Sequence, residues 1–334
     1  MKHWQVIVIV LLLAASAWAV VLYPLGTRTV RIVAGTTPMP IVRDAQPVML
    51  LFAGDIMLSR SVGDSMNAKR DWLWPFSRIA SVTASADLAF ANLETTVSTR
   101  GAKNGCGFCF RADPKAVVGL VNAGFDVLSV ANNHIWDFGP QAFTDTLGYL
   151  AVNDISAVGG GRNAAEARLP VVRTVRGARI AYLAYTDLLP ASAGALASHS
   201  GANIWDEQRM KEDVARARTM ADVVVVSVHS GTEYELLHNA VQGRMYHAII
   251  DAGADLVVGT HPHVVQDVER YGGKWIAYSL GNFVFDQNFS EETRKGLLLV
   301  VTVTGGRIAD VSQIPVDISN QYQVAIHDSR TTIR

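Results

Sequence analysis

Cysteine is almost absent from this sequence of 334 residues, which contains only Cys106 and Cys109. A structural zinc site would need further cysteine or histidine ligands at nearby spacing, and the neighbouring residues offer none. The pair lies in the segment Gly105-Cys-Gly-Phe-Cys-Phe110. A disulfide, two free thiols without a role and a redox centre all stay open, although Gly105 and Gly107 disfavour the helix that a thioredoxin-like centre requires. A compartment outside the cytoplasm would favour the disulfide.

An excess of charge of either sign is also missing. The sequence has 29 basic and 30 acidic residues, a formal net charge of -1 at pH 7, and no long run of one sign. Proteins that capture nucleic acid are usually more basic, so we expect no nucleic-acid partner. There is no internal repeat and no low-complexity tract. Hydrophobic residues make up 49% and charged residues 18% of the chain, which argues against general disorder and allows one large domain with a sizeable core.

The N-terminal residues 6–23 are almost wholly apolar, and only Lys2, His3 and the amino terminus precede them as positive or potentially positive groups. The stretch is just long enough to cross a bilayer and is longer than the apolar part of most cleaved signal peptides. We therefore expect a single-pass signal anchor in residues 1–26 that holds the domain outside the cytoplasm, at the cell membrane. An Ala-x-Ala match ending at Ala19 keeps a cleaved signal peptide, with a secreted or periplasmic product, as the alternative.

The remaining chain divides into a linker, a domain and a tail. Residues 27–47 are polar and dotted with proline, which is typical of a linker. We expect the domain in residues 48–320 and a C-terminal tail in residues 321–334.

Short apolar runs bounded by turn residues predict buried strands, at residues 48–53, 88–91, 127–130, 171–175, 180–185, 223–228, 256–259 and 275–279. Helical patterns lie between them, at residues 114–123, 141–153, 206–220 and 241–252. This alternation predicts a layered α/β fold. Residues 171–185 and 296–311 have the pattern of hairpins, so we expect mixed sheets.

Reactive polar residues follow the strand-like runs directly, and ligands of open α/β sheets bind at the carboxyl ends of strands. Four of the nine histidines are placed in this way, which turn chemistry alone does not explain. The segments are Gly54-Asp55, Asn92-Leu93-Glu94, Asn132-Asn133-His134 with Asp137 and Gly139 beyond, His229-Ser230-Gly231 with Glu233, Gly259-Thr260-His261-Pro262-His263 and Ser279-Leu280-Gly281-Asn282.

These segments offer carboxylate, amide and imidazole ligands, a set suited to manganese, zinc or iron(II). Pro262 stiffens the turn between His261 and His263, so both imidazoles can face one cavity. Two metals that share a bridging carboxylate could clamp a phosphoryl group, with His134 as general acid. Taken singly, each residue also has a simpler explanation as a turn former, a helix cap or a buried core histidine. The predicted ligands are Asp55, Glu94, Asn133, His229, His261 and His263.

The six motifs, taken in order, resemble those of the CapA family, which is linked to poly-γ-glutamate capsule synthesis and belongs to the calcineurin-like metallophosphatase superfamily. The resemblance runs from about residue 50 to residue 287. It implies a four-layer α/β/β/α sandwich with mixed sheets and a site at one edge of the two sheets. The motifs are Gly54-Asp-Ile-Met-Leu58, Asn92-Leu-Glu94, Asn132-Asn-His-Ile-Trp-Asp-Phe-Gly139, His229-Ser-Gly-Thr-Glu-Tyr234, Gly259-Thr-His-Pro-His-Val264 and Ser279-Leu-Gly-Asn-Phe283.

The resemblance also implies roles for single residues. Asp55 matches the first metal aspartate, and Glu94 stands about where the superfamily has its bridging carboxylate. Asp55 and His134 are the implied catalytic residues, His134 as transition-state donor. The remaining ligands match its asparagine, its next histidine and its closing Gly-His-x-His, and are Asn133, His229, His261 and His263. Further residues that could complete the shell are Asn92, Glu233 and Asn282.

The sequence also departs from the superfamily pattern. Met57 occupies the histidine position of the first Asp-x-His motif, so one metal loses a nitrogen ligand. Glu94 is reached through Asn-Leu instead of the usual Gly-Asp-x-x-Asp. Both departures are typical of the CapA family itself, and they leave open whether one or two metals bind. The Cys-x-x-Cys segment stands where the resemblance leads us to expect a plain strand, so we interpret it as a local embellishment.

Two functions follow as hypotheses. The first is a metal-dependent hydrolase outside the cytoplasmic membrane that cleaves a phosphoester or an amide bond of an envelope polymer such as poly-γ-glutamate. The second is a non-catalytic component of capsule synthesis or export that binds metal or polymer at the same site. In both, the expected partners are the polymer, the membrane components of a capsule synthase and the cytoplasmic membrane.

Overall fold

Two mixed β-sheets stand at the centre of residues 46–328, the part of the chain that the computed structural model describes. The expected anchor in residues 1–26 and nearly all of the expected linker lie outside the described residues. Within residues 46–328, no helix is both long enough and apolar enough to span a bilayer.

The larger sheet has its centre at β1, which runs parallel to β2 and antiparallel to β16. A short strand, β15 (Asn282–Val284), pairs in parallel with the end of β1 and lies off the main path. The strands along that path are β18 (Val324–Ile326), β17 (Arg307–Ile318), β16 (Lys295–Thr304), β1 (Val48–Ile56), β2 (Leu88–Leu93), β5 (Phe125–Ser129) and β6 (Ser156–Val158).

The second sheet has a parallel centre flanked by two antiparallel edge strands. In spatial order its strands are β13 (Val268–Tyr271), β14 (Lys274–Ala277), β12 (Leu256–Thr260), β11 (Val223–His229), β9 (Ala178–Thr186) and β8 (Val171–Val175). Two small sheets pair β3 (Thr96–Val97) with β4 (Arg111–Ala112) and β7 (Gly160–Gly161) with β10 (Gly201–Ala202).

Both expected hairpins are present, so the prediction of mixed sheets is confirmed. β8 and β9 are joined at Arg176-Gly177, where both residues have positive φ, 48° and 84°. A two-residue turn with positive φ at both positions matches the right-handed twist of the strands it connects. β16 and β17 are joined in the same way at Gly305-Gly306.

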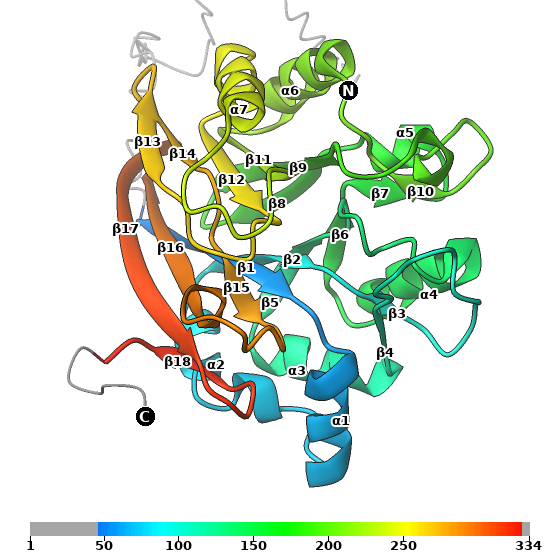
Figure 1. The fold of residues 1–334 in the computed structure, drawn as a ribbon. Helices are drawn as coiled ribbons and strands as arrows, with labels where there is room; N and C mark the ends of the chain where they lie inside the picture. The colour runs from blue at the N-terminus through cyan, green and yellow to red at the C-terminus, as the bar shows by residue number, and fades with distance from the viewer. Residues whose placement is uncertain (1–45, 329–334) are drawn as a thin grey trace, which may run out of the picture. The chain divides into compact units, whose positions relative to one another are not determined.

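Helices cover the outer faces of the two sheets, as Figure 1 shows for α6 and α7 over the strands β9, β11 and β12. The helices are α1 (Arg60–Lys69), α2 (Ala80–Thr83), α3 (Val117–Asn122), α4 (Gly139–Ala151), α5 (Ala164–Ala167), α6 (Glu207–Met220) and α7 (Ala240–Asp251). Short 3-10 turns are η1 (Trp74–Phe76), η2 (Pro114–Ala116), η3 (Ala191–Ala193) and η4 (Glu292–Arg294).

Side chains that alternate between the two faces of each sheet form three separate hydrophobic clusters. In β1, Leu50 and Phe52 point into the cluster between the two sheets, whereas Leu51 and Ala53 point into the cluster under the helices α1 to α4. A third cluster joins the second sheet to α6 and α7. Successive side chains of a strand face opposite sides of its sheet, so strands that are apolar on both sides are buried between two layers. The fold therefore has four layers in the order helices, sheet, sheet and helices, and one apolar cluster lies at each of the three interfaces.

Two boundaries differ from those expected. Residues 114–123 form η2 followed by the short α3 and not one continuous helix, because Asp113 caps a turn that opens on Pro114. The sheet also continues past residue 320, since β18 pairs with β17 and buries Val324. The expected tail thus includes one strand of the larger sheet.

Candidate metal centre

The strand pairing brings four of the polar segments to one place. Asp55, near the end of β1, is in register with Asn92 of β2 on one side and with Asn282 of β15 on the other. This pairing requires a close approach of backbones, because a Cβ atom on Gly54 would lie 1.8 Å from the carbonyl oxygen of Gly281. His229 ends β11, next to β12 in the second sheet. The carboxyl ends of strands from both sheets therefore meet at this edge.

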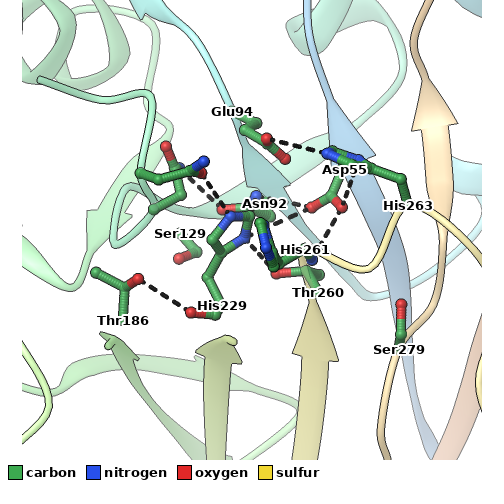
Figure 2. Close-up of polar contacts among 12 residues, drawn as sticks. Asp55, Asn92, Glu94, Ser129, Thr186, His229, Thr260, His261, His263 and Ser279 are labelled. Carbon is green, nitrogen blue, oxygen red and sulfur yellow. Dashed lines mark hydrogen bonds and ion pairs between the residues drawn. The ribbon is translucent and has the colours of Figure 1, made fainter. Parts of the chain in front are cut away.

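A first group of candidate ligands consists of Asp55, Glu94 and His229. All three side chains are buried, and each offers an atom within 4.8 Å of the others. The amide of Asn92 donates to Asp55 Oδ1 at 2.8 Å, and the backbone N–H of His261 donates to Asp55 Oδ2 at 3.1 Å (Figure 2). These two donors, one on each oxygen, fix the orientation of the Asp55 carboxylate.

Two further contacts extend this group. His229 Nε2 lies 2.8 Å from Asn133 Oδ1, and His229 Nδ1 lies 3.0 Å from Thr260 Oγ1. The structure thus places Asn133, a predicted ligand, directly against another predicted ligand from the opposite sheet. Asn132 takes a supporting place, because its amide donates to Asn92 Oδ1 at 3.0 Å.

A second group consists of Glu233, His261 and His263, again within 4.8 Å of one another. Glu233 is exposed, whereas both histidines are buried. Glu94 connects the two groups, since its Oε1 lies 3.7 Å from His263 Nε2 (Figure 2). Sequence reasoning placed Glu233 among the supporting residues, but the structure puts its carboxylate in position to be a ligand.

The orientation of His263 is fixed by its neighbours. Its Nδ1 lies 3.0 Å from Asn282 Oδ1, and the amide of Asn282 donates to Gln287 and to the carbonyl of Thr293. Since the Asn282 oxygen can only accept, His263 carries its proton on Nδ1 and keeps a lone pair on Nε2. A partner that orients the far nitrogen of a ligand histidine in this way is usual at metal sites.

His261 and His263 both adopt left-handed backbone conformations, with φ of 100° and 58°. Such conformations cost about 1 to 3 kcal/mol for residues other than glycine and persist only where the surrounding structure imposes them. Tyr234 contributes to that constraint, because its N–H donates at 2.8 Å to the carbonyl of Pro262, between the two histidines. Strain of this kind is common at functional sites.

A divalent cation fits the residues present. Both carboxyl oxygens of Glu94 and the Nδ1 atom of His261 are buried and have no hydrogen-bond partner. A buried polar atom without a partner is rare and costly, and a divalent cation held by these carboxylate and imidazole groups would offset that cost. The donor set of carboxylates, imidazoles and one amide is the kind that binds borderline divalent metals.

Burial shifts the pKa values of the candidate ligands in the direction that favours their neutral forms. It raises the pKa of Asp55 to about 7, and burial together with the nearby Asp55 raises the pKa of Glu94 well above its usual range. Burial lowers the pKa of His261 to about 4 and that of His263 to about 3, and it lowers the pKa of His229 well below its usual range. The imidazoles are therefore unprotonated and ready to bind at neutral pH, and a cation would favour the charged carboxylates.

His134 lies at the rim of this cluster. Its Nδ1 is 2.8 Å from Asp137 Oδ2, its Nε2 is 3.9 Å from Glu94 Oε1, and its ring stacks on Phe110 with 3.8 Å between centroids. Asp137 accepts the Nδ1 proton and so orients the ring with Nε2 toward the cluster. Sequence reasoning did not assign Asp137 a role, although it stands three residues after His134 in the same motif and this spacing was a usable signal.

The position of Met57 bears on how many metals fit. Its sulfur accepts hydrogen bonds from the N–H and the hydroxyl of Ser59 at 3.2 and 3.1 Å, and its side chain is completely buried. A thioether engaged in this way does not replace the imidazole that the superfamily pattern has here.

The structure pairs Cys106 with Cys109 in a disulfide.

Arg60 is a further residue near the site to which the sequence assigned no role. Its guanidinium lies 5.2 Å from the centre of the Phe110 ring and pairs with Asp286, whose side chain is buried. A lone arginine after a strand has no pattern that would have singled it out.

The fold and the site together define a class of protein, namely a layered α/β protein with a candidate divalent-metal site where the edges of its two mixed sheets meet. The sequence profile of the bacterial capsule synthesis protein PGA_cap matches residues 49–287. The capsule biosynthesis protein CapA of Bacillus anthracis is 31% identical over 284 residues, which cover 83% of this chain and 69% of that protein. The PGA biosynthesis protein CapA of Bacillus subtilis is 32% identical over 270 residues, 80% of this chain and 70% of that protein. The chain belongs to the PGA_cap family, and the predicted resemblance is confirmed.

Among solved structures, the NAD nucleotidase of Haemophilus influenzae is similar with a TM-score of 0.49 at 11% identity. The match covers 86% of this chain and 53% of that chain, so this protein spans about half the length of that neighbour.

Proposed function

We propose that this protein is a metal-dependent hydrolase that acts outside the cytoplasm in the synthesis of a capsule or poly-γ-glutamate polymer. The observation that carries the proposal is Glu94, a buried carboxyl group whose two oxygens have no partner and which lies between two groups of candidate ligands. The names of the two Bacillus relatives support the role in polymer synthesis. The bond cleaved is a phosphoester or an amide of the envelope polymer.

The metal is manganese, zinc or iron, bound as one or two ions. Two groups of ligands that meet at Glu94 would suit two ions, whereas Met57, in place of a histidine, weakens one of the two positions. The ligands in this proposal are Asp55, Glu94, Asn133, His229, Glu233, His261 and His263.

Each part of the reaction falls to a named side chain. A divalent cation supplies Lewis-acid polarisation of the phosphoryl or carbonyl oxygen when it is bound. His134 donates a proton from Nε2 to the leaving group, and Asp137 holds the other nitrogen so that this proton points inward. Asp55 orders the cluster through the N–H of His261 and the amide of Asn92. Asn92 and Asn282 hold the ligands Asp55 and His263 in place.

The proposed location is the outer face of the cytoplasmic membrane, with the N-terminal segment as a single-pass anchor, or free after cleavage near Ala19. The proposed partners are the polymer and the membrane components of its synthase. The disulfide between Cys106 and Cys109 supports an oxidising surrounding, because such bonds persist mainly outside the cytoplasm.

The test combines metal analysis of the purified full chain with turnover of phosphomonoester, phosphodiester and γ-glutamyl substrates. We expect His261→Ala to lose metal and turnover together. We expect His134→Ala to keep its metal and to lose about 10²- to 10⁴-fold in kcat, as is usual for a general acid. His327→Ala, which removes an exposed histidine paired with Asp317, is the matched control. A purified protein that binds no divalent metal would overturn the proposal.

A second function is favoured by Met57. A site that lacks one imidazole could hold a metal or a polyanionic polymer without hydrolysing it, as part of capsule synthesis or export. Bound metal with no turnover on any of the three substrate classes would favour this alternative.

A further inference from the structure

A disulfide-bridged loop of residues 104–110 lies beside the candidate site. Its tip is exposed at Gly105, Gly107 and Phe108, while its last residue, Phe110, is buried. We call residues 104–110 the bridged loop. The sequence resemblance predicts a plain strand in this place, and the proposed function assigns no role to the bridged loop.

Three contacts from the bridged loop converge on one residue, Asp137. The N–H of Asn104 donates to the Asp137 carbonyl at 2.8 Å, and the N–H of Phe110 donates to Asp137 Oδ2 at 2.7 Å. The sulfur of Cys106 lies 3.6 Å from the same carbonyl. The first and last residues of the loop thus both hold Asp137, one through its backbone and one through its side chain.

The same Asp137 oxygen that accepts from Phe110 also contacts His134 Nδ1, at 2.8 Å. The Phe110 ring stacks on the His134 ring, with 3.8 Å between centroids and 28° between planes. Phe110 therefore supports His134 in two ways. Its N–H holds Asp137, which contacts the edge of the imidazole ring, and its own ring packs on the face of the imidazole. A small displacement of Phe110 would move both supports together.

Apart from the bridge, the loop is held at its two ends by Asp137 and at its tip by the guanidinium of Arg60, 5.6 Å from the centre of the Phe108 ring. Gly105 has a left-handed conformation with φ of 72°, and neither it nor Gly107 would bring a Cβ within 4 Å of any neighbour. The carbonyl side of Phe110 is held independently, since it accepts from the N–H and the hydroxyl of Thr96 at 3.2 and 2.8 Å. The amide side of Phe110 is continuous with Cys109, so the bridge sets where that N–H points.

A bridge across a sequence separation of three adds less to global stability than one that closes a long loop, because stabilisation on the chain-entropy account grows with loop length. Its main effect is expected to be local.

We propose that the Cys106–Cys109 bridge is a positioning element for His134, which acts by holding Phe110 against Asp137 and against the imidazole ring. Its effect on turnover rests on the proposed function, whereas its effect on the geometry of His134 does not. Cys106 and Cys109 touch no candidate metal ligand directly in the described structure, so metal binding is not expected to depend on them.

The decisive comparison is between the wild-type full chain and Cys106→Ser/Cys109→Ser, with Gly107→Ala as a control that alters the same loop and leaves the bridge intact. Hydrogen exchange reports the Phe110 amide, and long-range ¹H–¹⁵N spectra report the tautomer of His134. We expect exchange at Phe110 to be at least about tenfold faster in the double variant, because local opening controls exchange. We expect the hydrogen-bonded Nδ1–H signal of His134, which the contact with Asp137 maintains in the wild type, to be lost. Gly107→Ala should match the wild type in both.

Two further measurements separate this inference from the proposed function. Metal affinity should be equal in all three proteins. If the wild type turns over substrate, the double variant should lose about tenfold to a hundredfold in kcat with little change in KM, since a misplaced catalytic group costs this much. Reduction of the wild type by a phosphine, which yields two thiols and the phosphine oxide with an oxygen from water, should reproduce the exchange result without substitution.

Unchanged exchange at Phe110 and an unchanged His134 tautomer in the double variant would overturn the inference, whatever the activity. A wild type without turnover would instead count against the hydrolase proposal, and the exchange and spectral results would still decide the role of the bridge.

Discussion

Glu94 is the residue on which the chemistry of the site depends. It is completely buried, its two oxygens have no hydrogen-bond partner, and Asp55 lies close enough to raise its pKa further. A carboxyl group in these surroundings is stable in two ways only, with a proton or beside a cation. The protein therefore carries a residue that is unfavourable for the metal-free fold, and such a cost is typical of a binding site.

Glu94→Gln is expected to impair metal binding without destabilising the metal-free fold. The amide keeps the shape of the side chain and cannot take on the charge that burial beside Asp55 disfavours, so the metal-free variant should unfold at the same temperature as the wild type or a higher one. It should also lose the rise in Tm that saturating Mn²⁺ gives the wild type, because stabilisation by a ligand follows its affinity. Thermal unfolding with and without the metal measures both effects.

Asp145→Asn is the control for this experiment, since Asp145 is an acid paired with Arg100 away from the ligand groups. It should leave the metal-dependent rise in Tm intact. A Glu94→Gln protein that still gains stability from Mn²⁺ would contradict the role given to Glu94.

At the scale of single residues, sequence reasoning identified the side chains but not their geometry. Strand ends rich in histidine and carboxylate pointed to His261 and His263, because the periodicity of buried strands is a local signal. Their left-handed backbones and the hydrogen bond that His263 donates to Asn282 depend on segments far along the chain, which no local pattern encodes. Asp137 stands in the same motif as His134, but the hydrogen bond by which it orients the His134 ring is visible only in the structure.

At the scale of elements, α7 supports the loop that carries Glu233 and Tyr234. A capping box begins the helix, with Asn239 accepting from the N–H groups of Val241 and Gln242. The buried Gln242 then donates to Gln266 at 2.9 Å. Gln266 in turn donates to the carbonyls of two residues of that loop, Glu235 and Leu237. The start of one helix is thus coupled by hydrogen bonds to one wall of the site.

Asn239→Ala removes this cap. We expect it to lower the free energy of unfolding by about 1 kcal/mol, the usual cost of losing such a residue. Val241→Ala, at an exposed position of the same turn, should change it by less than about 0.5 kcal/mol. Urea unfolding of both variants measures the difference, and equal values would show that the box contributes nothing.

The elements themselves were largely predictable. The apolar runs of β1, β11 and β12 and the helices α6 and α7 have strong periodicity, and their existence follows from it. The shortest elements were missed because two or three residues carry no period. β15 is the instructive example, since its pairing with β1 places Asn282 next to Asp55 and is set by the close approach of Gly54 and Gly281.

At the scale of the described molecule, the last strand completes the larger sheet. β18 covers the edge of β17 and buries Val324, and the carbonyl of Gln321 accepts from the Trp74 indole at 2.9 Å. Because β18 is very short, it leaves fewer unpaired backbone groups at the edge of the sheet than the longer β17 would. The sequence predicted only a C-terminal tail here, because three residues of strand are too short for a pattern to show.

Ending the chain after residue 320 is expected to destabilise the fold. Loss of Val324 burial alone should cost about 2 kcal/mol, and exposure of the β17 edge should promote association. Chemical unfolding and light scattering measure the two effects. The full chain carrying Ile326→Ser, a change at an exposed position of the same strand, should remain close to the wild type in both. A truncated protein as stable as that variant would show that β18 is not needed.

The ligand cluster joins residues that lie far apart in the sequence: Asp55 Oδ2 and the N–H of His261, which bond directly, are 206 positions apart. Contacts of such range form late, since they require the chain between them to close first. A bound ion would therefore not nucleate folding in the way that zinc does in small fingers, because its candidate ligands come together only when both sheets are in register. A chain in which the two sheets fail to pair would lack the complete set of candidate ligands, so the metal content of a preparation would measure its correctly folded fraction.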